Sequence, residues 1–387
     1  MINEHYTERQ VLTGAEALLG AAVLAGAQVC FANPGTTEMP LVAALDSVTG
    51  IRAVLGLHEN VCTGAADGYA RMTGRPAMTL LHLGPGLANG LSNLHNARRA
   101  HSPVVNVVGD HASWHLPADP PLASDIAALA GTVGAYHQVR DRTAIASATR
   151  DAIRAAIERR GVSTLVVPAD FLLEPARDCP CAEPQGQITL GSVGGDRIEA
   201  AARQLREAGP RGVLLLGGAG LTRQGQRAAG KISAATGAAL YSETFPARAE
   251  RGGGLPAIDR LPYFPEAAID KLRDANAVIL AGAAEPVAYF GYPGTPSQLA
   301  PDRTVYQLAG PGDDAEQALS ASADVLGGPG AVPRPGQAAE IFPAAAALTA
   351  ESVGSALASW LPENAIVSIE GGTCGYPFYT ASAGAAP

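Results

Sequence analysis

Three side chains that can share, donate or accept protons each follow a short apolar run in this 387-residue chain: Glu59, His82 and Thr36. Short apolar runs of this kind are typical of buried strands. The carboxyl ends of parallel strands meet at one edge of a sheet, which is where ligands bind in open α/β folds. We therefore expect Glu59, His82 and Thr36 at one edge, where they could serve in acid–base chemistry and substrate binding.

Each of these residues also has an ordinary structural explanation. An acid such as Glu59 at the start of a helix is favoured by the helix dipole, and a histidine at a strand end can be satisfied by the backbone. Asp110 and His111 follow another apolar run and could lie at the same edge. The i, i+4 spacing of His111 and His115 could suggest a zinc site on a helix, but no third ligand is evident.

The elements that must position these residues form an alternating pattern over residues 1–175. Apolar runs alternate with helical segments, which predicts a doubly wound parallel sheet. One predicted helix, 59–73, is rich in small residues, and this favours close packing at an interface between chains. Further predicted helices cover 11–25 and 143–160. The predicted strands lie near 28–32, 53–57, 77–83, 103–108 and 163–167.

A linker dense in proline and glycine spans 174–195 and separates this domain from a second α/β unit, a Rossmann-like domain over 196–327. Its turn Gly217–Gly220 suggests a dinucleotide site. The pattern Gly-x-Gly-x-x-Gly is broken, however, because Arg223 stands at the last glycine position. We therefore do not expect FAD or NAD there. Strands are predicted near 211–216, 238–241, 277–282 and 303–308.

Composition excludes several classes of function. The net charge of −9, with no basic run, argues against nucleic-acid binding. No apolar run is long enough to cross a membrane, and the first residues lack the pattern of a signal peptide. The five cysteines are scattered and odd in number, which is typical of a reduced, cytoplasmic protein.

Three collinear strings carry a resemblance to a known family: NPGTTE at 33–38, HENVCTGAADGYARMTG at 58–74 and LHLGPGLANGLSNLHNARRAHSPVVNVVGD at 81–110. Together they resemble the pyrimidine-binding domain of thiamine-diphosphate-dependent enzymes. Acetolactate synthase large subunits and benzoylformate decarboxylase are the families most alike. The resemblance implies a 2-oxo-acid substrate and either decarboxylation or carboligation.

The resemblance also implies a role for each candidate residue. Glu59 would hold the pyrimidine ring of the cofactor and favour the tautomer that activates it. His82 would act with Glu59 as the second catalytic residue, and Thr36, Asp110 and His111 would face the substrate. The residues expected to bind thiamine diphosphate are Pro34, Gly35, Glu59, Gly86, Asn89, Glu370, Gly371, Gly372 and Thr373.

Residues 344–387 resemble the start of the family's third domain, which binds the diphosphate group. A strand is predicted at 365–369 and a turn at 370–375, after a helix over 344–361. The family's Gly-Asp-Gly signature is absent, so the Mg²⁺ ligands are expected outside this sequence. The chain is therefore expected to bind the cofactor very weakly and to be inactive by itself. We expect a homodimer or homotetramer, or a separate chain that supplies the third domain.

The positions of the histidines bear on which 2-oxo acid could be the substrate. Benzoylformate decarboxylase brings a second histidine from its middle domain, whereas all eight histidines here lie at or before His137. The 2-oxo acid is therefore left open. Two alternatives to the enzyme remain: a non-catalytic homologue that only folds and dimerises, and a nucleotide-binding α/β module that uses Gly217–Gly220.

Overall fold

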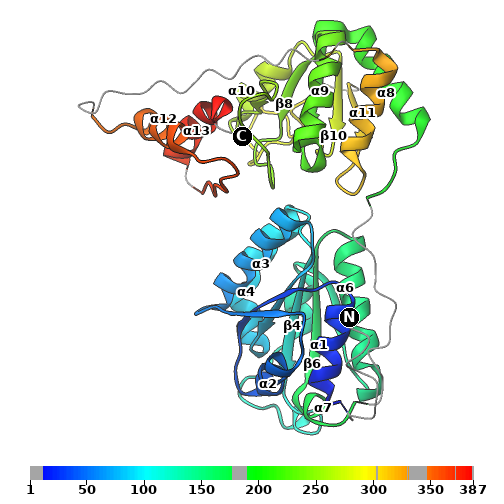
Figure 1. Cartoon of the computed structure of the whole chain (residues 1–387), viewed down its shortest axis with the longest axis vertical. Helices are drawn as coiled ribbons and strands as arrows, with labels where there is room; N and C mark the ends of the chain where they lie inside the picture. The colour runs from blue at the N-terminus through cyan, green and yellow to red at the C-terminus, as the bar shows by residue number, and fades with distance from the viewer. Residues whose placement is uncertain are drawn as a thin grey trace. The chain divides into compact units, whose positions relative to one another are not determined.

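The computed structural model describes residues 12–176, 190–301, 304–328, 330, 347–370 and 372–385. The chain divides into two compact units, Met1–Thr189 and Leu190–Pro387. Figure 1 shows the helices and strands of each unit.

The first unit contains a six-stranded sheet in the order β2-β1-β3-β4-β6-β5, and every pairing in it is parallel. The five predicted strands are confirmed within a few residues. The sixth, β5, was missed because its sequence GAYHQ is partly exposed and lacks an apolar run. The strands are β1 (Val29–Asn33), β2 (Arg52–Leu55), β3 (Ala77–Leu81), β4 (Val104–Asp110), β5 (Gly134–Gln138) and β6 (Val162–Pro168).

Helices cover both faces of this sheet, as a doubly wound fold requires. One apolar core joins the sheet to α1 (Gly14–Leu24), α2 (Met39–Ser47), α6 (Ile145–Glu158) and α7 (Ala169–Leu173). The opposite core joins it to α3 (Glu59–Thr73), α4 (Leu83–Arg99) and α5 (Ile126–Gly131). Figure 1 shows α3 and α4 side by side, away from α1 and α6. The predicted helix 59–73 is confirmed, and its small residues Gly64 and Thr63 pack against Asn93 and Gly90 of α4.

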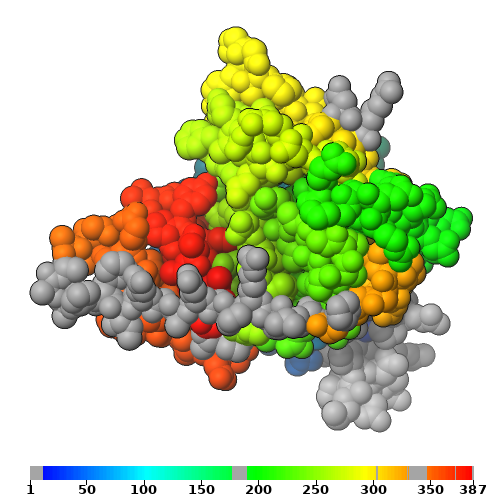
Figure 2. Space-filling view, turned by 90° about the horizontal axis from the view of Figure 1, so that it is seen from above, coloured from blue at the N-terminus to red at the C-terminus, as the bar shows by residue number. Residues whose placement is uncertain are grey.

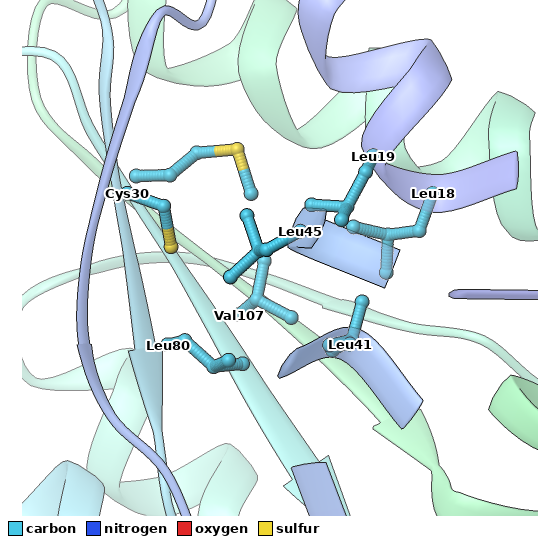
Figure 3. A pocket seen from close by; sticks show the side chains of 8 residues that line it. Leu18, Leu19, Cys30, Leu41, Leu45, Leu80 and Val107 are labelled. Carbon is cyan, nitrogen blue, oxygen red and sulfur yellow. The ribbon is translucent and has the colours of Figure 1, made fainter. Parts of the chain in front are cut away.

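The core beneath α1 and α2 is closely packed (Figure 3). Eight apolar side chains surround its centre and leave no space for a water molecule, so this is packing and not a ligand site. Burial raises the pKa of the Cys30 thiol to about 12, so the thiol stays protonated and behaves as a small apolar group. The eight residues are Leu18, Leu19, Cys30, Leu41, Leu45, Met78, Leu80 and Val107.

Buried polar side chains cross the middle of the sheet in a ladder of three residues, Thr79, Asn106 and Thr164. The Thr79 hydroxyl donates to Asn106 Oδ1 at 2.8 Å, and Asn106 Nδ2 donates to Thr164 Oγ1 at 3.1 Å. All three residues are fully buried on β3, β4 and β6. Because water cannot reach this position, each partner depends on the others for its hydrogen bonds.

Thr79→Val is expected to destabilise the first unit by about 1–3 kcal/mol, because it leaves the buried oxygen of Asn106 without a donor. Ser163→Ala is the matched control. The Ser163 hydroxyl, on β6 one residue before Thr164, is buried and has no partner among the described residues. Because this hydroxyl has no hydrogen bond to lose, its removal is expected to lower the free energy of unfolding far less than Thr79→Val does. Urea unfolding of both variants measures the difference, and equal effects would contradict the role given to the ladder.

The second unit contains a five-stranded parallel sheet in the order β11-β10-β7-β8-β9. The four predicted strands are confirmed, and the two-residue β9 was too short to predict. The strands are β7 (Gly212–Leu216), β8 (Ala239–Ser242), β9 (Asp259–Arg260), β10 (Ala277–Ala281) and β11 (Val305–Ala309). The helices that pack around it are α8 (Gly195–Ala208), α9 (Arg223–Thr236), α10 (Pro265–Leu272) and α11 (Ala315–Leu326).

The C-terminal part of the second unit differs from the prediction. Residues 365–370 form no strand and are exposed, and α13 (Gly372–Ala381) replaces the expected turn. The strand prediction was wrong because a short parallel strand needs a neighbour, and no described strand pairs with 365–369. Helix α13 packs instead on α12 (Ala350–Trp360) and on the body of the unit, which Figure 2 shows in orange and red beside green.

Arginine–aromatic stacking holds α13 in place. The Tyr379 ring lies under the guanidinium of Arg251 at 3.6 Å and that of Arg260 at 3.9 Å. Arg251 Nε also donates to Ser382 Oγ at 3.0 Å. Contacts of this kind are favourable when partly desolvated. The C-terminal helices are therefore part of the second unit.

A helix can cross a membrane only if it is both long and apolar. Within the described segments, no helix is both long and apolar enough to span a bilayer.

Candidate cofactor and substrate site

The carboxyl ends of β1, β2, β3 and β4 lie at one edge of the first sheet, because all four strands are parallel. The loops and helices that follow them bring the predicted residues together there. Glu59 begins α3, and the preceding residue caps this helix: His58 Nδ1 accepts from the backbone N–H of Asn60 at 3.1 Å. His82 joins β3 to α4 directly.

Glu59 is a half-buried carboxylate with room for another hydrogen bond. Asn89 Nδ2, from α4, donates to Glu59 Oε2 at 3.0 Å. Within the described residues, no other side chain donates to Glu59. A Cβ at Gly86 would lie 3.2 Å from Glu59 Oε1 and 3.5 Å from His82 Cβ, so Gly86 lies between the two predicted catalytic side chains. Glycine at this position leaves Glu59 Oε1 accessible to a ligand.

His82 is fixed by a residue that sequence reasoning missed, Glu38. Glu38 Oε2 lies 2.8 Å from His82 Nδ1, and the Glu38 side chain is fully buried. Two more donors surround this carboxylate: the Gly35 N–H at 2.9 Å and the Thr37 hydroxyl at 2.7 Å. The only signal in the sequence is the acid that ends NPGTTE, and an acid just before a helix normally indicates an exposed N-terminus.

Two glycines make space for the pair of His82 and Glu38. A Cβ at Gly35 would lie 2.3 Å from His82 Nδ1, and one at Gly109 would lie 2.0 Å from Glu38 Oε1. Real atoms do not approach so closely, so alanine at either position would displace the pair. Gly35 lies against the His82 ring, and its predicted role in binding the cofactor stays a prediction.

The backbone next to His82 is strained. Leu83 is buried and has φ of +53°, a left-handed conformation that is unusual for a bulky residue. Such strain persists only where surrounding contacts impose it, and it is common at functional sites. Here it turns the chain sharply from β3 into α4 and holds His82 at the edge of the sheet.

The predicted substrate-facing residues lie around this edge. Thr36 is exposed in the short 3-10 helix Thr36–Glu38, and Pro34 precedes it in the loop after β1. Asp110 ends β4 and is buried, and burial raises its pKa although the N–H of His111 donates to Asp110 Oδ1 at 2.8 Å. His111 Nε2 is buried without a partner among the described residues.

The hypothesis of a zinc pair receives no support from the local structure. The segment that holds His111 and His115 is not an α-helix, and their rings pack edge to face with centroids 6.1 Å apart. Within the described residues, no group of three or more possible metal-ligating side chains occurs.

The predicted cofactor residues near the C-terminus lie in the second unit. Glu370 is exposed and outside any strand, and Gly372 and Thr373 begin α13. Gly371 lies outside the described residues. Their role in binding the cofactor stays a prediction.

The glycine turn of the second unit is closed by its own backbone. The N–H of Gly217 donates to Ala281 O at 3.0 Å, and a Cβ at Gly217 would lie 2.7 Å from Gly282 O. The turn therefore packs against the loop after β10. Nearby, burial raises the pKa of Glu243 to about 7. The expectation that FAD does not bind here stays a prediction.

Comparison with known proteins agrees with the geometry of the first unit. Residues 12–145 match the family described as "Thiamine pyrophosphate enzyme, N-terminal TPP binding domain". A Mycobacterium tuberculosis protein, provisionally named acetolactate synthase large subunit IlvX, is 46% identical over 383 residues, which cover 97% of this chain and 72% of that protein. The chain belongs to the thiamine pyrophosphate enzymes.

Two further proteins show lower identity to this chain. Benzoylformate decarboxylase from Pseudomonas aeruginosa is 38% identical over 99 residues, 26% of this chain and 18% of that enzyme. An X-ray structure from Mycobacterium smegmatis, provisionally titled a thiamin diphosphate-dependent enzyme, aligns with a TM-score of 0.77 and 23% identity over 92% of this chain and 71% of that chain. This structural likeness confirms the predicted α/β fold with parallel sheets.

Proposed function

We propose that this chain forms part of a thiamine-diphosphate-dependent enzyme that acts on a 2-oxo acid, and that its first unit supplies the site for the cofactor's pyrimidine ring. The arrangement of Glu59 carries the proposal. Its carboxylate is half-buried, is held by Asn89 on one oxygen, and leaves the other oxygen beside a glycine. These features fit a carboxyl group that shares a hydrogen bond with a ring nitrogen.

Each residue at the edge has a part in this proposal. When bound, thiamine diphosphate supplies an electron sink for breaking or forming the bond next to a 2-oxo group. Glu59 holds a proton or hydrogen bond at the pyrimidine ring, and Asn89 orients Glu59. His82 moves a proton at the substrate, and Thr36 with Asp110 and His111 binds polar groups of the substrate. Decarboxylation and carboligation are both compatible with these roles.

The proposal also includes a metal ion, a cellular location and an assembly. Mg²⁺ accompanies the diphosphate group, since hard oxygen ligands of phosphate bind it well. The protein acts in the cytoplasm as a homodimer or homotetramer, or together with a chain that supplies the diphosphate site. Support for an interface comes from Leu55 and Val61, which are large apolar residues exposed at β2 and at the start of α3.

Thermal unfolding with added ligands tests the proposal. Millimolar thiamine diphosphate with Mg²⁺ is expected to raise the melting temperature of the first unit by a small amount, because even a weakly bound ligand stabilises the folded state that binds it. Asn89→Ala is expected to reduce the shift, because Glu59 loses its only described side-chain donor. Asn96→Ala is the matched control, since Asn96 is also exposed on α4 but contacts Asn93 instead.

Two results would contradict the proposal. No shift with thiamine diphosphate would favour a non-catalytic homologue. A shift with NAD or FAD in place of thiamine diphosphate would favour a nucleotide-binding module built on Gly217–Gly220.

A further inference from the structure

We infer that Glu38 is a positioning residue for His82: it keeps the proton of the neutral ring on Nδ1, so that Nε2 offers its lone pair at the edge of the sheet. The role of His82 at a substrate rests on the proposed function. The tautomer itself is a property of this chain and can be tested without cofactor or substrate.

The hydrogen bonds around Glu38 determine the direction of the bond to His82. A carboxylate can only accept hydrogen bonds. It receives the Gly35 N–H, the Thr37 hydroxyl and, at 2.8 Å, the ring of His82. The Thr37 hydroxyl also lies 3.4 Å from His82 Nδ1, but its shorter bond, at 2.7 Å, goes to Glu38 Oε1. With Glu38 ionised, His82 Nδ1 is therefore the donor. Glu38 is 0% exposed, so water does not compete for this carboxylate, whereas the His82 side chain is 27% exposed.

Close packing surrounds the pair of His82 and Glu38. Gly35 lies against the ring of His82, and Gly109 lies against Glu38 Oε1, each closer than a side chain would permit. Directly after His82, the left-handed backbone of Leu83 sets the direction in which the chain leaves the ring. Three separate positions in the sequence thus hold one imidazole in one orientation.

The orientation has a chemical consequence. Which nitrogen of a neutral histidine carries the proton is set by the hydrogen bond that the other nitrogen makes. With the proton on Nδ1, the partly exposed Nε2 can accept a proton from a substrate or from water. The ring then becomes an imidazolium that the buried carboxylate stabilises, and it can return the proton from Nε2. A buried acid that orients a histidine in this way commonly raises the rate of proton transfer.

Nitrogen-15 NMR of the full chain labelled at histidine tests this inference at alkaline pH, where histidine rings are neutral. His82→Gln identifies the His82 signals by their loss. The wild-type chain is expected to show the Nδ1–H form at His82. Glu38→Ala is expected to shift the population to the Nε2–H form. Glu38→Gln is expected to keep the Nδ1–H form, because an amide oxygen can still accept from Nδ1.

Asp67→Ala is the control for loss of a buried acid, since Asp67 is buried in the same unit but pairs with Arg71 and Ser102. It is expected to leave the His82 signals unchanged. An Nε2–H form in the wild-type chain would overturn the inference, and so would an Nδ1–H form that persists in Glu38→Ala. If Glu38→Ala does not fold, the wild-type and Glu38→Gln spectra still decide the tautomer. Failure of thiamine diphosphate to stabilise the chain would remove the proposed function and leave this result standing.

Discussion

In an enzyme completed by the diphosphate-binding domain, Glu59→Gln is expected to slow hydrogen–deuterium exchange at C2 of the bound thiazolium ring by at least about a hundredfold, the usual range for a positioned acid or base. Glutamine keeps the shape of the side chain and can still accept from Asn89 Nδ2, which lies 3.0 Å from Glu59 Oε2. It cannot share a proton with the pyrimidine ring in the same way. Acid-quench proton NMR at a saturating cofactor concentration measures the exchange.

Asn96→Ala serves as the control here too, because it changes the same helix without touching Glu59. Calorimetry on the same samples separates binding from activation, and Glu59→Gln is expected to bind the cofactor nearly as well as the wild type. Exchange at the wild-type rate in a saturated Glu59→Gln sample would remove Glu59 from the activating role.

Leu80→Ala is expected to lower the free energy of unfolding of the first unit by about 2–5 kcal/mol, the range for truncating a buried leucine. Leu80 is 2% exposed on the central strand β3 and packs beside Leu41 and Val107 (Figure 3). The side chains there leave no space for water, so the truncation creates a cavity that neighbours can only partly fill.

Urea unfolding followed by circular dichroism gives this change, and hydrogen exchange of β3 peptides locates it in the first unit. Leu173→Ala is the matched control, because Leu173 is 66% exposed at the end of α7. It is expected to change stability by less than about 0.5 kcal/mol. Equal losses in the two variants would show that the core around Leu80 is not packed as described.

Sequence reasoning located the fold because the apolar runs of the first unit are buried on both faces of a parallel sheet. The carboxyl ends of parallel strands meet at one edge of a sheet. This placed Glu59 and His82 at one edge, since both follow such runs. It did not find Glu38. A buried acid is recognised by its partners, and these come from the loop after β1 and the end of β3, which are distant in the sequence.

At 365–369 the sequence predicted a strand that the structure does not contain. Its residues are apolar enough for a strand, but strand formation depends on a neighbouring strand and not on composition alone. The described chain offers no such neighbour, and α13 is held instead by Tyr379 between two arginines. Contacts of that kind leave no periodic pattern in a sequence. The same is true of the left-handed backbone at Leu83.

The ladder of Thr79, Asn106 and Thr164 also restricts how the sheet can assemble. These residues stand directly opposite one another in the native register of β3, β4 and β6. A slip of two residues would keep the apolar faces buried but would place Asn106 opposite Ala77 or Leu81, with no donor for its oxygen. Leaving that amide unsatisfied costs about 1–3 kcal/mol. Parallel strands pair slowly, after long stretches of chain have come together. The apolar side chains of these three strands alone would tolerate several registers. The ladder therefore selects against mispaired sheets during folding.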